Sequence, residues 1–289
     1  MKDGIMAIEA TARRSVELSI GTIRYDDVGA GPPLVFVHGM LVSGALWHSV
    51  VPALRSNFRC IVPTLPLGAH TVPMPAGADL SPRGLARAIA EFLEVLDLRD
   101  VTLVGNDTGG ALCQLVIAHH PERIARLVLT NCDAFEYFPP LVLSPLYGAA
   151  HVPGFLWALA QLLRLRPLQR LFFAMVARRK PDPAFLAASF GPFIADARVR
   201  GDLRTTMRAV SRRDTLAAAK KFASFGGPVL ILWGADDLFF PIGLAHRLVH
   251  AFPNARLQIV EGSRTFLSED NPMALVASLE AFVAAPAVA

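Results

Sequence analysis

Short runs of β-branched and other apolar residues alternate along the chain with longer stretches in which apolar positions recur at helical spacing. This alternation is typical of a mostly parallel sheet that carries helices on both faces. The pattern predicts an opening hairpin, 15–20 and 22–25, turned at Gly21. It then predicts strands at residues 34–37, 59–62, 101–104, 126–130, 229–233 and 257–260. We therefore expect an α/β fold with a doubly wound, mostly parallel, eight-stranded sheet.

Helical patterns fill the intervals between these strands, at 46–54, 81–96, 109–119, 242–251 and 271–283. Ser81-Pro82 places a serine at the N-cap and a proline at the first helical position, which is a strong start signal. Asn271-Pro272 predicts a similar start for the last helix.

A long insertion interrupts the strand pattern. Residues 135–225 read as helices without a strand signal, so we expect a core formed by 1–134 and 226–289 and a helical cap formed by 135–225. The charge-free stretch 137–163 is long enough to cross a bilayer. Four prolines interrupt it, and proline breaks a continuous helix. We therefore predict an apolar lid and no membrane span.

Composition excludes several classes of protein. Hydrophobic residues make up 53% and charged residues 18% of the 289-residue chain, which is enough for a large core. The net charge of +4 comes from scattered residues, so we expect no nucleic-acid partner. Three cysteines without metal-ligand spacing, and no signal-peptide pattern at the N-terminus, favour a reducing, cytoplasmic setting. No phosphate fingerprint or metal motif occurs, and we expect no cofactor.

The chemistry is concentrated in residues 101–113, where a buried strand runs directly into a helix through Gly105-Asn106-Asp107-Thr108-Gly109. This is the spacing of a nucleophile elbow, with aspartate where serine usually lies. Small residues are needed there because the turn is sharp and the central side chain must stand clear of the backbone. The following helix N-terminus favours a negative charge at this position.

With these residues the chain resembles the α/β-hydrolase superfamily, in particular the aspartate-nucleophile branch that includes haloalkane dehalogenases and epoxide hydrolases. Two further motifs support the resemblance. Residues 34–39, ending in His38-Gly39, resemble the family's oxyanion-loop strand, and residues 232–237, followed by Pro241, resemble the strand that ends in the catalytic acid.

The resemblance implies a role for several residues. Asp107 would attack an electrophilic carbon and form an ester. The backbone amides of Met40 and Thr108 would form the oxyanion hole. Asp237 would orient a histidine, while its neighbour Asp236 would be a turn residue. Asp133, just past a strand end, is a second candidate for the acid.

The chain departs from the family at the histidine. The loop that should carry it, 261–266, has Thr265 at that position, and no histidine follows His250. A threonine hydroxyl cannot act as a base near neutral pH, so the usual hydrolysis of the ester lacks its water activator. Thr108 also replaces the tryptophan that dehalogenases place after the nucleophile, and Met40 replaces an asparagine. Of the tyrosines that epoxide hydrolases would need, Tyr137 and Tyr147 fall near the cap.

We expect His38, Asn106, Trp157 and Thr265 beside a small hydrophobic substrate. His38 is the histidine nearest the predicted site, although a structural role in the oxyanion loop fits it better than that of a base. His151 lies in the lid.

Three hypotheses for the function remain open. The first is a hydrolase of an ester, epoxide or halide with Asp107 as nucleophile. The second is a lyase, decarboxylase, isomerase or cyclase in which Asp107 is a general acid or base. The third is a binder without catalysis.

Overall fold

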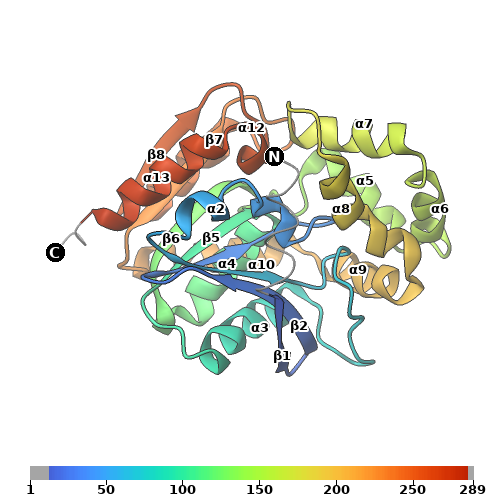
Figure 1. Ribbon diagram of the computed structural model, residues 1–289, viewed down its shortest axis with the longest axis horizontal. Helices are drawn as coiled ribbons and strands as arrows, with labels where there is room; N and C mark the ends of the chain where they lie inside the picture. Colours follow the sequence, from blue (N-terminus) through green and yellow to red (C-terminus); the bar gives the residue numbers. More distant parts are fainter. Residues whose placement is uncertain (1–12, 286–289) are drawn as a thin grey trace.

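A computed structural model describes residues 13–285, and an eight-stranded sheet forms its centre (Figure 1). The strand order is β1-β2-β4-β3-β5-β6-β7-β8, antiparallel between β1, β2 and β4 and parallel elsewhere. The strands are β1 Arg13–Leu18, β2 Gly21–Val28, β3 Pro33–Val37, β4 Arg59–Thr64, β5 Val101–Asp107, β6 Ile124–Cys132, β7 Val229–Gly234 and β8 Ala255–Val260. The expected fold class is confirmed.

Two layers of helices bury the two faces of the sheet. Successive side chains of a strand point to opposite faces, and β3 shows the consequence. Val35 and Val37 belong to one buried cluster, while Leu34 and Phe36 belong to the other. The first cluster includes residues of α3 Pro82–Val95, α4 Thr108–His119 and α11 Ile242–Ala251. The second includes residues of η1 Gly44–Trp47, α2 Val51–Leu54, α12 Leu267–Asp270 and α13 Pro272–Ala284.

The start signals of the helices are confirmed in part. Ser81 caps α3, with its hydroxyl accepting from the Gly84 amide at 3.1 Å. Asn271 precedes α13 but makes no side-chain cap. The single helix expected over 46–54 is wrong, because the segment divides into η1 and α2. Pro52 lies in the first turn of α2, where a backbone N–H would have no helical partner, so its absence costs nothing. Within a longer helix, the same proline would interrupt the turn before it.

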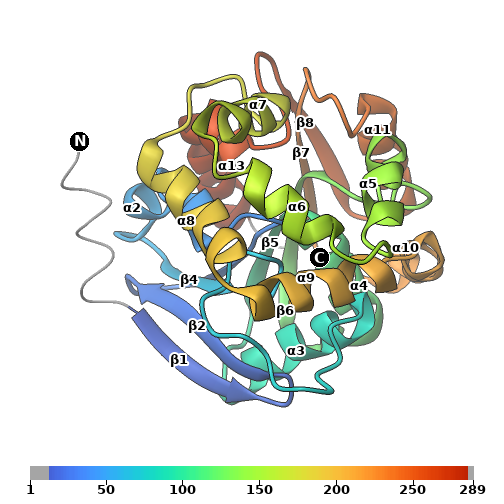
Figure 2. The same ribbon diagram turned by 90° about the vertical axis from the view of Figure 1, so that its right-hand side faces the viewer.

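The segment between β6 and β7, residues 135–225, contains helices and no named strand, and we call it the helical insertion. Its elements are η3 Leu141–Leu143, α5 Ser144–Ala149, α6 Phe155–Leu162, α7 Arg166–Val176, α8 Pro183–Ala195, α9 Ala197–Ala209, α10 Arg212–Ala219 and η4 Phe222–Ser224. Helices α5 to α9 lie together on one side of the sheet in both views, whereas α10 packs against α4 (Figures 1 and 2). Within residues 13–285, no helix is long and apolar enough to cross a membrane.

Polar contacts attach the helical insertion to the rest of the chain. Asp202 of α9 accepts from the His70 ring and from the Met74 amide, each at 2.9 Å. At the other end, the carbonyl of Val176 accepts from the Phe266 amide at 2.8 Å. The insertion is therefore connected to the two loops that follow β4 and β8.

Candidate active site

Asp107 occupies a strained corner between β5 and α4. Its φ is 53° and its ψ is −131°, a conformation that costs a non-glycine residue about 1–3 kcal/mol. Its side chain makes no capping hydrogen bond to α4. The flanking glycines allow close approach: a Cβ at Gly105 would lie 2.7 Å from Cys113 Sγ, and one at Gly109 would collide with the carbonyls of Val37 and His38. The corner therefore leaves no room for a side chain at either flanking glycine.

The loop after β3 contacts this carboxylate directly. The Met40 amide donates to Asp107 Oδ2 at 3.2 Å. A side chain at Gly39 would overlap the same carboxylate, so only glycine fits between β3 and the corner. The carboxyl ends of neighbouring parallel strands therefore meet at Asp107.

The site shifts the ionisation of Asp107 into the neutral range. Burial raises the pKa of Asp107 to about 7, the amides of Met40 and Thr108 oppose the rise, and the charge of Asp237 adds to it. Near neutral pH the residue therefore exists in both its acid and its anionic forms.

Asp133 supplies a second carboxyl group at the end of β6. It is fully buried, and the Thr108 hydroxyl donates to its Oδ2 at 3.3 Å. Its Oδ1 has no hydrogen-bond partner among the described residues. Burial, together with the charge of Asp107, raises the pKa of Asp133 well above its usual range, which favours the neutral acid.

Three hydrogen-bond donors hold the Asp237 carboxylate. Its Oδ1 accepts from the amides of Phe239 at 2.7 Å and Phe240 at 3.0 Å, and its Oδ2 accepts from the Asn131 side chain at 2.7 Å. Burial raises the pKa of Asp237, and these donors and the Thr265 side chain lower it. Asp236 instead forms an ion pair with Arg178, away from this cluster.

Thr265 lies in the loop between β8 and α12 and is buried. Its carbonyl accepts from the Asn106 side chain at 2.7 Å. The Asn106 amide also donates to the Thr130 hydroxyl at 2.9 Å and the Asn131 carbonyl at 3.3 Å. Through its side-chain nitrogen, Asn106 therefore joins β5 to β6 and to the Thr265 loop, and its role as a substrate contact stays a prediction.

His38 is hydrogen-bonded to the backbone through both of its ring nitrogens. Its Nδ1 donates to the Gly39 carbonyl at 2.8 Å, and its Nε2 accepts from the Leu65 amide at 2.9 Å. Burial lowers the pKa of His38 to about 4. Both ring nitrogens are occupied, so the imidazole is neutral and holds the loop that carries Met40.

Two residues of the helical insertion that the sequence singled out lie at the surface. Trp157 is 60% exposed on α6 and does not line the site, because α6 turns other apolar side chains inward. His151 is exposed as well. Within residues 13–285, no histidine hydrogen-bonds to Asp107 or Asp237, and no group of three His, Cys, Asp or Glu residues could hold a metal ion.

Tyr147 of α5 reaches the site from the helical insertion. Its hydroxyl lies 3.2 Å from Met40 Sδ. Burial raises the pKa of Tyr147 well above its usual range, the charges of Asp133 and Asp107 add to this, and the Thr108 hydroxyl opposes it. The phenol therefore stays protonated beside the carboxyl groups. The sequence signal for it was weak: a tyrosine in a charge-free stretch.

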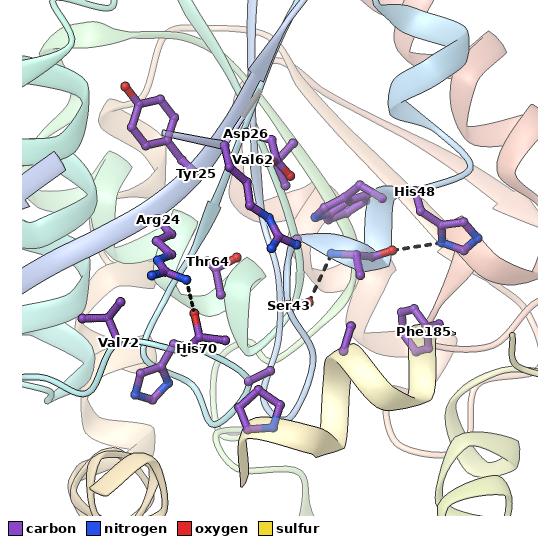
Figure 3. Close-up of a pocket in the computed structure, with 18 of the residues that line it drawn as sticks. Arg24, Tyr25, Asp26, Ser43, His48, Val62, Thr64, His70, Val72 and Phe185 are labelled. Atoms are coloured by element: carbon purple, nitrogen blue, oxygen red, sulfur yellow. Dashed lines mark hydrogen bonds between the residues drawn. The ribbon is translucent and has the colours of Figure 1, made fainter. Parts of the chain in front are cut away.

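A separate cavity of about 480 Å³ lies between β2, η1 and α8 (Figure 3). Arg24 and His70 line one side of it, and His48 and Phe185 lie across from them. Two of its polar side chains are engaged within the protein, since Arg24 donates to Thr71 and His48 pairs with Glu269. None of the three aspartates of the site lines this cavity.

Several of the known proteins that this chain resembles are enzymes. The chain is 29% identical over 273 residues to haloalkane dehalogenase 2 of Mycobacterium tuberculosis, covering 92% of this chain and 93% of the relative. It is 26% identical over 280 residues to cis-3-alkyl-4-alkyloxetan-2-one decarboxylase of Shewanella oneidensis, covering 90% and 85%. The structure of an epoxide hydrolase superposes with a TM-score of 0.79 at 20% identity, covering 94% of this chain and 98% of the other, which shows a shared fold. The model of the alpha/beta hydrolase fold family matches residues 32–272, and the chain belongs to that family.

Proposed function

We propose that this protein is an enzyme in which Asp107 attacks a small apolar electrophile and in which the resulting ester is released without histidine-activated water. The observation that carries the proposal is the environment of Asp237. A triad acid would orient a histidine, but here the side chain next to the Asp237 carboxylate is that of Thr265, and the other donors to it are Asn131, Phe239 and Phe240.

A strained cyclic ester is the substrate class that fits this site best. One relative is named for the decarboxylation of an oxetan-2-one, a four-membered cyclic ester. Its conversion to an alkene and carbon dioxide consumes no water, so the reaction does not need the missing base.

The bonds can be balanced through Asp107 alone. The Asp107 carboxylate forms a bond to the saturated ring carbon next to the ring oxygen. The bond between that carbon and the ring oxygen breaks, and a substrate carboxylate is released. The bond between this carboxylate and its neighbouring carbon then breaks. Carbon dioxide leaves, the electron pair forms the double bond, and the Asp107 carboxylate departs as the leaving group. No proton or water molecule is gained or lost overall.

The neighbouring groups have complementary roles in this scheme. The Met40 amide holds Oδ2 of Asp107 and stabilises its charge. The Tyr147 phenol, protonated and beside the site, would donate to the ring oxygen as it gains charge. The helical insertion would serve as a cap that keeps bulk water from the ester. The free thiols of Cys60, Cys113 and Cys132 fit a reducing, cytoplasmic location.

The experiment is turnover of a cis-3,4-dialkyl-oxetan-2-one in water labelled with oxygen-18. We expect alkene and carbon dioxide as products and no label in Asp107 after many turnovers, with activity abolished in Asp107→Asn. Labelled Asp107 together with a hydroxy acid product would show the hydrolytic route instead. Turnover that persists in Asp107→Asn would refute any role for this carboxylate.

The neutral-range pKa of Asp107 favours a second candidate, in which this residue transfers a proton and forms no covalent bond. Asp133, held neutral by burial, would then be the second carboxyl group of an acid–base pair. Rapid quenching and peptide mass spectrometry separate the two routes, because only the covalent route gives an alkylated Asp107 peptide.

A further inference from the structure

Of the twelve large apolar side chains exposed in the part of the chain that the structure describes, seven lie between residues 141 and 171 of the helical insertion. Each of these seven is between 53% and 69% exposed, on η3, α6, α7 or the turns beside them: Leu141, Val142, Val152, Trp157, Leu162, Leu165 and Leu171. We call this set the outer apolar face. Helices α5, α6 and α7 lie on the side of the molecule turned toward the viewer in Figure 2.

Helix α6 is apolar on both its sides. Leu156, Leu159 and Ala160 are buried, while Trp157 and Leu162 are exposed. A helix that is apolar all round is normally enclosed by protein or by lipid. In α7, only Phe173 is buried, so most of that helix also lies at the surface.

The charge of this region has a single sign. Residues 137–181 contain no aspartate or glutamate, and the exposed Arg164, Arg166 and Arg170 lie beside the apolar side chains. Within residues 13–285, none of these three arginines forms an ion pair. The outer apolar face is therefore flanked by uncompensated positive charge.

We propose that the outer apolar face docks the protein on the surface of a bilayer that contains anionic lipid. Exposed tryptophan and leucine at the acyl boundary, with arginines that reach the headgroups, are the features of an interfacial helix. A second copy of the chain fits less well. A symmetric contact would bring the same arginines together with no acidic residue of this face to pair them.

Docking through this face would bring the helical insertion to the lipid surface. Tyr147 lies on α5 in the same insertion, so an apolar substrate dissolved in the bilayer would meet the protein close to the candidate active site. The outer apolar face does not include Asp107 or its neighbours. An experiment can therefore refute membrane docking without refuting the proposed chemistry, and the reverse.

Trp157 gives a direct probe of docking. The other two tryptophans, Trp47 and Trp233, are buried, so a change in emission on adding vesicles reports Trp157. We expect a blue shift and quenching by brominated lipids with vesicles of equal parts phosphatidylglycerol and phosphatidylcholine. Flotation with these vesicles should weaken at high salt and fall sharply with phosphatidylcholine alone.

Two double variants test separately the contributions of the arginines and of the apolar side chains to vesicle binding. Arg164→Glu with Arg166→Glu, and Leu162→Ser with Leu165→Ser, should each weaken vesicle binding by roughly tenfold or more. Val95→Ser with Arg55→Glu is the matched control, since both residues are exposed on the core. Circular dichroism confirms that each variant is folded. Trp157→Phe should remove the emission change and retain most of the flotation.

Two results would overturn the proposal. One is vesicle binding by these two double variants that equals that of the control. The other is an emission shift that appears on raising the protein concentration without vesicles, with a dimer in sedimentation, which would assign the face to a second copy of the chain.

Discussion

The side-chain amide of Asn131 donates to Oδ2 of Asp237 over 2.7 Å, across the carboxyl ends of the neighbouring strands β6 and β7. Asn131 Oδ1 also accepts from the Gly234 amide at 2.6 Å. The asparagine thus fixes the Asp237 carboxylate without a histidine. Asp237 acts on the site through its charge, which raises the pKa of Asp107.

Asp237→Asn should therefore shift the pH dependence of activity. Without the Asp237 charge, the pKa of Asp107 falls, and the rise of kcat/KM with pH moves to lower pH. Asp236→Asn is the matched control, because its carboxylate pairs with Arg178 instead. Equal pH profiles for the wild type and Asp237→Asn would show that the Asp237 charge does not act on Asp107.

The wild-type pH profile should distinguish an Asp107 that acts in its ionised form, as a nucleophile or a general base, from an Asp107 that acts as a general acid. A nucleophile or a general base must be ionised, so kcat/KM should rise through about pH 7 and then stay level. A general acid must be protonated, so that route predicts a fall above the same pH. The measurement is kcat/KM with an oxetan-2-one substrate across the neutral range, and a profile that is flat through pH 7 would contradict both routes.

Much of the core could be predicted because its signals are local. The strands and the corner at Asp107 follow from β-branched runs and from glycines whose neighbours leave no room for a Cβ. Asp133 and Asp237 could be placed beside Asp107 because the ends of parallel strands meet at one edge of the sheet.

The contribution of the helical insertion could not be predicted in this way. Its helices are apolar on more than one side, so the pattern did not show which residues face inward, and Trp157 was assigned to the wrong side. Tyr147 reaches Met40 across 107 positions of sequence, a contact without any local signal. The hydrogen bonds of Asn106 likewise depend on the Thr265 loop far along the chain.

Asp107→Asn should stabilise the protein at alkaline pH while it abolishes activity. The folded-state pKa of about 7 lies above the ordinary aspartate value of 3.8, so folding favours the neutral acid. The contribution of the Asp107 carboxyl group to stability is fully present below the unfolded pKa and is lost as pH rises through about 7. In urea unfolding, the free energy of unfolding of the variant should exceed that of the wild type by roughly 4 kcal/mol at alkaline pH and differ little near the unfolded pKa. A gain that is equal at both pH values would contradict the raised pKa.

Thr265→His should divert the reaction toward hydrolysis. The new imidazole would lie beside Asp237, where that carboxylate can orient it, and would activate water against the Asp107 ester. Because position 265 is buried, the larger side chain should cost about 1–3 kcal/mol of stability. In oxygen-18 water, we expect label in Asp107 and a hydroxy acid beside the alkene. Thr265→Val removes the hydroxyl at nearly constant volume and adds no base, so it should leave Asp107 unlabelled. Label in Thr265→Val or in the wild type would mean that another group already activates water, and that the ester is not released by elimination alone.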